Sequence, residues 1–334
     1  MGALRKFDIG IDLGTSKFSI WTSSDGLVST VPAYLAFRGR ELTSASIVAV
    51  GEDARAMIGR VSSDAVQVVC PMKDGVIVNR HAAELIVKYM TRKIGRHWGL
   101  GRPSTLATLP LGASSLERKT FFDVARSLGN TRVVMMEEPL AAANSLDVDL
   151  SEPYAYLVLD IGEGVTEAIV VSMGKKVMGK SLRTGGVAID QAIVDYIRTC
   201  YRMEISRDQA RELKEALSGL AVSSSSFLSY SGIDQIRLIP TMRSIVAGEL
   251  YALIDKVCEP IIVMIRDILN VLPPEFSVDL IENGIYLCGG GALTVGIREK
   301  LAEATGLDVH SADAPQNAVI KGIGRLMKYV EHLG

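Results

Sequence analysis

Two stretches of the chain share one order of apolar and polar positions. Each runs from an apolar segment into Asp, then Gly and Thr, then a second apolar segment, and they span Ile9–Lys17 and Val158–Glu167. Apolar runs on both sides of a Gly-rich turn predict a β-hairpin. One such turn is an ordinary hairpin, but the repetition places one in each half of the chain and predicts two related domains.

The composition of these turns indicates phosphate chemistry. Glycine lets backbone N–H groups approach an anion closely, and Thr adds a hydroxyl donor. The Asp can hold a hydrated Mg²⁺ but would repel a bare phosphate. We therefore expect the two hairpins to grip a nucleoside triphosphate between them.

A third segment, Gly284–Leu293, is predicted to be a buried strand that ends in a triple-Gly turn. The apolar spacing of Val295–Ala302 predicts a helix after it. Backbone in such a turn can approach an adenine or a ribose with no side chain between them. Alone the signal is weak, because Gly-rich turns between strand and helix have many uses.

Strand-like and helix-like patterns alternate along the rest of the chain. Apolar runs predict strands over 105–109 and 133–136. Helical spacing predicts helices over 81–94, 115–128, 137–146, 188–201, 206–219 (capped by Ser206) and 317–329, and long helices over 242–269 broken near Pro260. This alternation predicts an α/β fold in which helices cover the sheets.

Composition excludes several classes of protein. The chain has 334 residues, 48% of them hydrophobic and 22% charged, which suits two globular domains. A net charge of −2 gives no drive toward nucleic acid. The four cysteines are scattered and indicate a reduced compartment without a zinc site. The N-terminus lacks an apolar signal core, and no run reaches the roughly 18 apolar residues of a membrane span, so we expect a cytoplasmic protein.

Several ordered motifs then resemble one family. The phosphate turns Asp12–Thr15 and Asp160–Thr166, the segment Glu137–Ala143 and the turn Cys288–Leu293 are similar to those of the actin/Hsp70/sugar-kinase ATPase superfamily. Pro71–Ile77, and Pro110–Ala113 followed by Glu117 and Arg118, resemble the bacterial actins of the MreB type, including the related MamK filaments. The resemblance extends from about Asp8 to about Arg325.

The resemblance implies an actin-like (ribonuclease H-like) α/β fold. Two duplicated domains would surround a nucleotide cleft, each with a smaller outer subdomain. The first large subdomain would comprise 1–30, 70–147 and 320–334, and the first small subdomain 31–69. The second large subdomain would comprise 148–182 and 255–319, and the second small subdomain 183–254.

The resemblance also assigns site residues. Asp12 and Asp160 are expected to hold Mg²⁺ through water. ATP or ADP is expected to contact the two phosphate turns and the residues near them: Gly14, Thr15, Ser16, Lys17, Gly162, Glu163, Gly164, Val165, Gly185 and Gly186. Lys17 can reach phosphate oxygens or point to solvent. Lys214 and Glu215 would flank the ribose and base, unless that helix face is only solvated, and Gly289, Gly290, Gly291 and Ala292 would approach the adenosine.

For hydrolysis, the residues expected to act are Glu138, Asp160 and Thr166. Glu138 would orient the attacking water; its neighbour Glu137 competes for that role, and a Glu that only serves the helix dipole is the alternative. Two residues depart from the MreB pattern. Glu163 replaces a Gly, and Val165 replaces a Thr that is thought to assist hydrolysis, so slow turnover is expected.

The favoured function is an ATP-dependent cytoskeletal filament built from copies of this chain, for cell shape or organelle positioning. An actin-fold small-molecule kinase and a non-hydrolysing ATP-binding adaptor are the alternatives. A chaperone is disfavoured, because no residues remain for a peptide-binding domain. Peripheral membrane contact is expected through Arg92–Arg102, where basic residues surround Trp98, unless Trp98 packs on the core.

Overall fold

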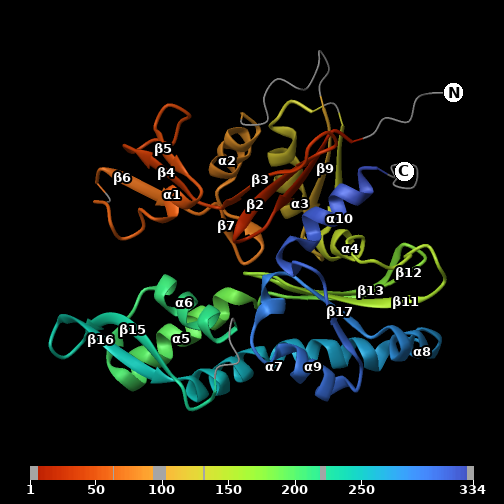
Figure 1. Ribbon diagram of the computed structural model, residues 1–334. Coiled ribbons are helices and arrows are strands. Elements are labelled where there is room, and N and C mark those ends of the chain that lie inside the picture. Colours follow the sequence, from red (N-terminus) through yellow and green to blue (C-terminus); the bar gives the residue numbers. More distant parts are fainter. Residues whose placement is uncertain (1–6, 63, 93–102, 131, 219–222, 329–334) are drawn as a thin grey trace.

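Each half of the chain is built on a five-stranded sheet, and the computed structural model gives both sheets the same strand order. The structure describes residues 7–62, 64–92, 103–130, 132–218 and 223–328. Of the segment Arg92–Arg102, which is expected to touch a membrane, only Arg92 is among these described residues. The two halves lie one above the other, and each carries a smaller lobe on the same side (Figure 1).

In the first half, three antiparallel strands form a meander and two parallel strands extend it, in the order β10-β9-β1-β2-β3. The strands are β1 (Ile9–Leu13), β2 (Lys17–Thr22), β3 (Gly26–Pro32), β9 (Ser104–Leu109) and β10 (Arg132–Glu137). The predicted hairpin is the pair β1–β2, with Asp12 opposite Ser19.

The second half repeats this topology in the order β13-β12-β11-β17-β18. Its strands are β11 (Ala155–Ile161), β12 (Thr166–Ser172), β13 (Lys175–Leu182), β17 (Ile285–Cys288) and β18 (Val309–Ser311). The second predicted hairpin is β11–β12, with Asp160 opposite Glu167. The two sheets confirm the expected duplication.

Strand β11 is buried on both faces, which explains its continuous apolar sequence. Leu157 and Leu159 belong to the core that includes residues of α5 (Gly186–Tyr201) and α7 (Ala247–Val271). Tyr156 and Val158 belong to a different core, shared with α4 (Glu138–Ala143). The helix α4 therefore covers the face of the sheet that carries Asp160, because side chains alternate along a strand.

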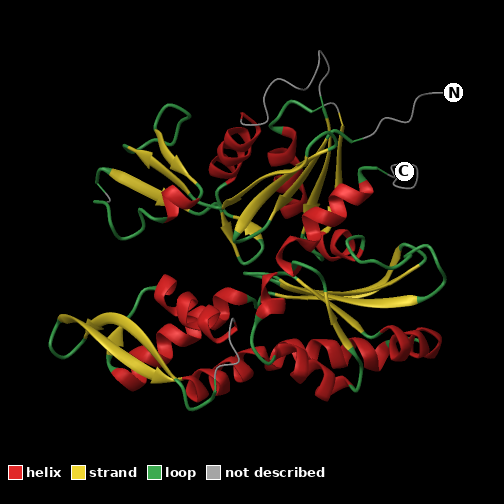
Figure 2. Cartoon of the chain, in the orientation of Figure 1, coloured by secondary structure: helices red, strands yellow, loops and turns green. Residues whose placement is uncertain are grey.

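Helices cover the outer faces and fill the space between the halves (Figure 2). The first sheet packs against α2 (Arg80–Arg92) and α3 (Ser115–Arg126), and the second also against α8 (Pro274–Asn283) and α9 (Ile297–Thr305). Between the halves, α10 (Ala318–Leu326) crosses α4 closely. A Cβ atom added to Gly322 would lie 1.7 Å from the carbonyl oxygen of Ala141.

Each smaller lobe holds a three-stranded sheet. The first contains β4 (Leu35–Arg38), β5 (Ile47–Val50), β6 (Val66–Val69) and the short helix α1 (Glu52–Arg55). The second contains β14 (Met203–Glu204), β15 (Phe227–Asp234), β16 (Ile239–Val246) and α6 (Arg207–Ser218). A two-stranded hairpin, β7 (Met72–Lys73) and β8 (Val76–Ile77), follows the first lobe.

The expectation of helices over 242–269 with a break near Pro260 is wrong both in where the helix starts and in the break. Residues up to Val246 belong to β16, because pairing with β15 prevails over the local helical spacing. The helix α7 then continues through Pro260. An interior proline costs a helix about 3 kcal/mol, and here Cys258, Ile261 and Ile262 on both sides of it are buried in the core, which offsets that cost.

The other predicted elements are present, with ends that differ by a few residues. Ser206 caps α6 as expected, since its hydroxyl accepts a hydrogen bond from the Gln209 N–H at 3.1 Å. The helix α3 has a full capping box between Ser114 and Glu117. In the part of the chain that the structure describes, no helix is long and apolar enough to cross a membrane.

Candidate nucleotide-binding site

A cavity of about 620 Å³ lies between the two halves and collects most of the predicted site residues. This volume suits a nucleotide-sized ligand. The residues lining it come from both hairpin turns, the triple-Gly turn, α6 and the 3₁₀ turns Gly290–Leu293 and Pro315–Asn317. Those predicted from the sequence are Asp12, Gly14, Thr15, Ser16, Lys17, Glu138, Asp160, Gly162, Glu163, Gly164, Val165, Gly186, Lys214, Glu215, Gly289, Gly290 and Gly291.

The first turn is braced by polar contacts from three directions. The Thr108 hydroxyl donates to Asp12 Oδ1 at 2.9 Å, and Lys17 Nζ donates to Asn317 Oδ1 at 2.9 Å. The Gly75 N–H, from the β7–β8 hairpin, donates to Thr15 Oγ1 at 3.0 Å. Lys17 therefore lines the cavity and does not point freely to solvent.

The second turn contacts the first so closely that it needs glycine. Its Gly162 N–H donates to the Val165 carbonyl at 2.8 Å and closes the turn. A Cβ atom on Gly164 would lie 2.8 Å from Thr15 Oγ1 and 2.9 Å from the backbone of Asp74. A larger residue at 164 would push the two phosphate turns apart.

The triple-Gly turn packs on β11 in the same way. A Cβ atom on Gly291 would lie 2.2 Å from the Ile161 side chain, and one on Gly289 would lie 2.2 Å from Asp160 Oδ1. Gly289 also has a φ of 79°, which disfavours other residues. Gly290 has no atom near its Cβ position and faces the cavity, so a ligand can approach the backbone there.

Three carboxyl groups line the cavity, those of Asp12, Glu138 and Asp160, and Glu167 lies opposite Asp160 on the neighbouring strand. Burial dominates the electrostatics of all four groups. Burial raises the pKa of Asp12 to about 6, although the Thr108 hydrogen bond and Lys17 oppose the shift. Burial, and then the charge of Asp12, raises the pKa of Asp160 to about 7. Burial also raises the pKa of Glu138 and of Glu167 well above the usual range, and each is raised further by neighbouring carboxylates. The cluster therefore favours a bound cation.

The structure places Glu137 and Glu138, the two candidates for orienting the attacking water, in different surroundings at the start of α4. Glu138 lines the cavity, whereas Glu137 forms ion pairs with Lys176 and Arg118 outside it. Glu138 is thus the one that can meet a ligand. Pro139 lies in the first turn of α4 as expected.

Thr166 does not lie where the sequence prediction needs it. It is fully buried, does not line the cavity, and its hydroxyl donates to the Thr184 carbonyl at 2.7 Å. Side chains alternate along β12, so Thr166 points to the α5 side of the sheet and Glu167 to the Asp160 side. This placement conflicts with the expected role of Thr166 in hydrolysis, because its hydroxyl is turned away from a ligand in the cavity.

Two further predicted contacts lie behind the cavity wall. Gly185 packs against the second turn, where an added Cβ atom would lie 2.5 Å from the Gly162 carbonyl oxygen. Ala292 packs against the core of the second half and does not line the cavity. Gly185 can still act indirectly, because it lets Gly186 reach the cavity.

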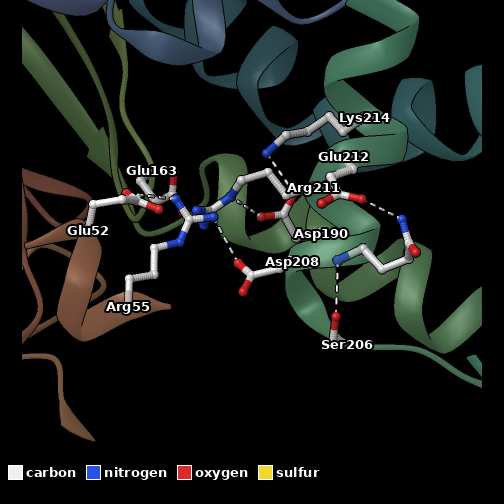
Figure 3. Close-up of polar contacts among 10 residues, drawn as sticks. Glu52, Arg55, Glu163, Asp190, Ser206, Asp208, Arg211, Glu212 and Lys214 are labelled. Carbon is white, nitrogen blue, oxygen red and sulfur yellow. Dashed lines mark hydrogen bonds and ion pairs between the residues drawn. The ribbon is translucent and has the colours of Figure 1, made fainter. Parts of the chain in front are cut away.

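The wall formed by α6 carries a cluster of ion pairs (Figure 3). Arg211 pairs with Glu163 of the second turn, and its Nε lies 3.4 Å from Asp190 Oδ2. Lys214 Nζ lies 2.6 Å from Asp190 Oδ1 and donates to the Gly186 carbonyl at 3.2 Å. This face of α6 is therefore not merely solvated, because Arg211 and Lys214 contact carboxylates of α5 and of the second turn.

One ion pair crosses from the first lobe to the second. Arg55, in α1, lines the cavity and donates to Asp208 Oδ1 in α6 at 2.8 Å (Figure 3). Asp208 and Arg211 are three residues apart and lie on the same side of the helix. The sequence analysis did not identify Arg55, because nothing local to α1 indicates a partner 153 positions away.

Glu167 and Asp190 were also missed. Asp190 is fully buried beside the apolar residue Ile189, and a carboxylate within an apolar helical run is a sequence signal for a buried ion pair. Glu167 accepts the Leu111 N–H at 2.7 Å through Oε1, whereas its buried Oε2 has no partner.

The residues that line the cavity fit a magnesium–nucleotide complex better than a metal ion bound by protein side chains alone. Among the described residues, no group of three or more His, Cys, Asp or Glu side chains is placed to hold a metal ion directly. Asp12 and Asp160 are buried carboxyls at the cavity. Mg²⁺ usually keeps several waters and takes one or two carboxylates together with substrate phosphates, which matches this donor set.

Comparison with known proteins gives consistent matches along the chain. The family model described as MreB/Mbl protein matches residues 6–334. The chain is 31% identical to the cell shape-determining protein Mbl of Bacillus cereus, covering 98% of this chain and 97% of that protein. It is also 31% identical to the cell shape-determining protein MreB of Escherichia coli, covering 99% and 98%.

Solved structures agree with these matches. MreB5 of Spiroplasma citri bound to AMPPNP aligns with a TM-score of 0.88 and 28% identity, covering 97% of this chain and 96% of that one. The ADP-bound form aligns with a TM-score of 0.89. The chain of a MamK double helical filament aligns with a TM-score of 0.76 at 19% identity, covering 96% and 98%, and supports the actin-like fold.

Proposed function

The chain belongs to the MreB/Mbl family, and from this we propose that it is an ATP-binding, ATP-hydrolysing cytoskeletal protein that assembles into filaments. The observation that carries the proposal is the cavity between two duplicated hairpin turns, with Asp12 and Asp160 among its lining residues. Structures of a similar MreB5 protein with AMPPNP and with ADP support nucleotide binding.

In this proposal the phosphates lie between the two turns. Backbone N–H groups of Gly14 and Gly164 would donate to them, and Lys17 would neutralise part of their charge. Asp12 and Asp160 would accept hydrogen bonds from waters on Mg²⁺. The ion would neutralise charge that develops on the phosphates during hydrolysis.

Glu138 is the residue we assign to the attacking water. It lines the cavity near both aspartates, whose charges help to raise its pKa. In its ionised form it would accept a hydrogen bond from the water and orient it toward the terminal phosphate. Val165 lines the cavity with an apolar side chain and adds no hydroxyl, so we propose that turnover is slow.

The base end of the ligand would lie against α6 and the triple-Gly turn. Lys214, Glu215 and Gly290 line that part of the cavity. The backbone of Gly290 lies open to a flat ring, since a Cβ atom there would meet nothing within 4 Å.

Assembly follows from the two-lobed architecture. We propose that the subdomain boundaries are those expected from the resemblance, with 31–69 and 183–254 as the outer lobes. Nucleotide binding would bring the lobes together, and this closed form would favour head-to-tail contacts between copies, which do not close and so build filaments. A role in cell shape is proposed from the names of the relatives. Membrane contact through Arg92–Arg102 stays a proposal.

Sedimentation of the purified protein with Mg-ATP, with Mg-ADP and without nucleotide tests the proposal, combined with negative-stain microscopy and a phosphate-release assay. We expect filaments in the pellet that depend on ATP, and slow phosphate release. A soluble protein that binds ATP but neither assembles nor releases phosphate would favour the adaptor. Phosphate transfer to a small molecule would favour the kinase.

A further inference from the structure

Within the proposed nucleotide site, the turn that would receive the phosphates carries a carboxylate of its own. Glu163 lies between Gly162 and Gly164, and all three residues line the cavity. A negative charge in this place repels a polyanionic ligand. Backbone donors alone would bind phosphate better, so the carboxylate needs an explanation.

The position of this carboxylate is well defined. The Glu163 carbonyl accepts the Val187 N–H at 2.8 Å, which ties the turn to the start of α5. A Cβ atom added to Gly186 would lie 3.6 Å from Glu163 Oε2. Oε2 therefore lies beside Gly186, which lines the cavity, whereas Oε1 is held by Arg211.

Glu163 is the second of two carboxylates that pair with the two cations of this ion-pair cluster. Arg211 and Lys214 both lie against Asp190, which is completely buried. Two cations and one carboxylate leave one positive charge, and Glu163 cancels it through Arg211. The side chains of Arg211 and Glu163 are only 16% and 18% exposed, so water screens this pair less than a surface pair.

We propose that Glu163, held by Arg211, is a specificity-determining residue that sets the preference of the site for the number of phosphates. It weakens the binding of ATP more than that of ADP, because repulsion grows with the charge of the ligand. The ion pair limits this repulsion, so that ATP still binds but exchanges more readily. The proposal rests on nucleotide binding at this site and not on hydrolysis or assembly.

Coulomb's law gives the size of the effect. As an order of magnitude, two unit charges roughly 12 Å apart at an effective dielectric constant of about 20 interact with an energy that corresponds to about a tenfold change in affinity. Counterions reduce this value. We therefore expect the ratio of ATP affinity to ADP affinity to change by about three- to tenfold when Glu163 loses its charge.

The test is isothermal titration calorimetry of the full chain with Mg-ATP and Mg-ADP. Four proteins are compared: the unmodified chain, Glu163→Gln, Arg211→Gln and the double variant. Glu282→Gln is the control, because Glu282 is exposed on α8 and outside the cavity. We expect Glu163→Gln to raise ATP affinity more than ADP affinity. Arg211→Gln should lower both affinities, with the larger loss for ATP. The double variant should return close to the ratio of ATP affinity to ADP affinity of the unmodified chain.

Equal shifts for ATP and ADP, or weaker ATP binding in Glu163→Gln, would overturn the proposal. A third ligand, 2′-deoxy-ATP, identifies one cause: if Glu163→Gln weakens ATP but not 2′-deoxy-ATP, the carboxylate contacts the sugar. If Arg211→Gln does not fold, the proposal is tested by Glu163→Gln alone, through the direction in which the ratio of ATP affinity to ADP affinity changes. An unmodified chain that binds neither nucleotide would refute the proposed function itself, and this proposal with it.

Discussion

Replacing Asp160 by Asn should stabilise the nucleotide-free protein at pH 8 and abolish its nucleotide binding. Asp160 is only 7% exposed, and burial together with the charge of Asp12 raises its pKa to about 7. At pH 8 the folded protein must therefore hold a buried carboxylate that lacks a cation. Asn keeps the shape of the side chain and removes the charge.

The direction of the pH dependence follows from proton binding. The pKa of Asp160 is about 7 in the folded state and 3.8 as the reference value for the unfolded chain. Between these values the folded state binds more protons, so this group's contribution to stability is full below about pH 4, falls as the pH rises to about 7, and is then constant. The difference, at 1.36 kcal/mol for each pH unit, corresponds to about 4 kcal/mol.

The measured gain should be smaller. Part of the shift is shared with Asp12, and the Asn side chain brings an N–H group whose burial without a partner costs about 1–3 kcal/mol. We expect Asp160→Asn to raise the free energy of unfolding by about 2 kcal/mol at pH 8 and by much less at pH 5.

Urea unfolding from pH 5 to 8.5, in EDTA and after nucleotide removal, measures this effect. Asp308→Asn is the matched control, because Asp308 is exposed and outside the cavity. We expect the unmodified protein and the control to lose stability toward pH 8 and Asp160→Asn to lose less. An Asp160→Asn protein that is less stable at pH 8, with an unchanged pH slope, would refute the assignment of a buried and uncompensated charge.

Three further variants test other parts of the architecture. Glu138→Gln should lower the rate of phosphate release by at least about 100-fold and change ATP affinity by less than about threefold; unchanged release would remove Glu138 from the mechanism. Asp208→Asn breaks the pair with Arg55 that joins the lobes, and since half-exposed pairs are weak, we expect nucleotide release, followed by stopped-flow fluorescence, to rise about two- to fivefold. Gly322→Ala would place a carbon 1.7 Å from the Ala141 carbonyl oxygen, so the urea midpoint should fall by the equivalent of about 1–3 kcal/mol or more; an unchanged midpoint would mean that α10 and α4 separate at little cost.

The local sequence was sufficient where an element is defined by its own residues. The two hairpins and their turns follow from apolar runs interrupted by Asp, Gly and Thr, and the structure forms both as β1–β2 and β11–β12. The two hairpins were predicted correctly because glycine turns are encoded within a few residues. Glu138 lines the cavity and Glu137 does not, and the role of Glu138 in hydrolysis stays a prediction.

Two local signals misled the prediction. The apolar spacing from Met242 indicated a helix, but pairing with β15 makes a strand up to Val246. Pro260 indicated a break, but burial of the helix on both sides carries α7 past it. In both segments the contacts with distant residues are worth more than the local preference.

The tertiary structure alone decided which charges meet. Arg55 and Asp208 are 153 positions apart, and Arg211 and Glu163 are 48 apart. Which face of β12 carries Thr166 depends on strand register, which turns its hydroxyl toward the Thr184 carbonyl. Sequence therefore determined the turns and the carboxylates that enter the site, because their geometry is local. The folded chain determined their partners, their burial and thus their pKa values, because these depend on segments that meet only when the two halves pack together.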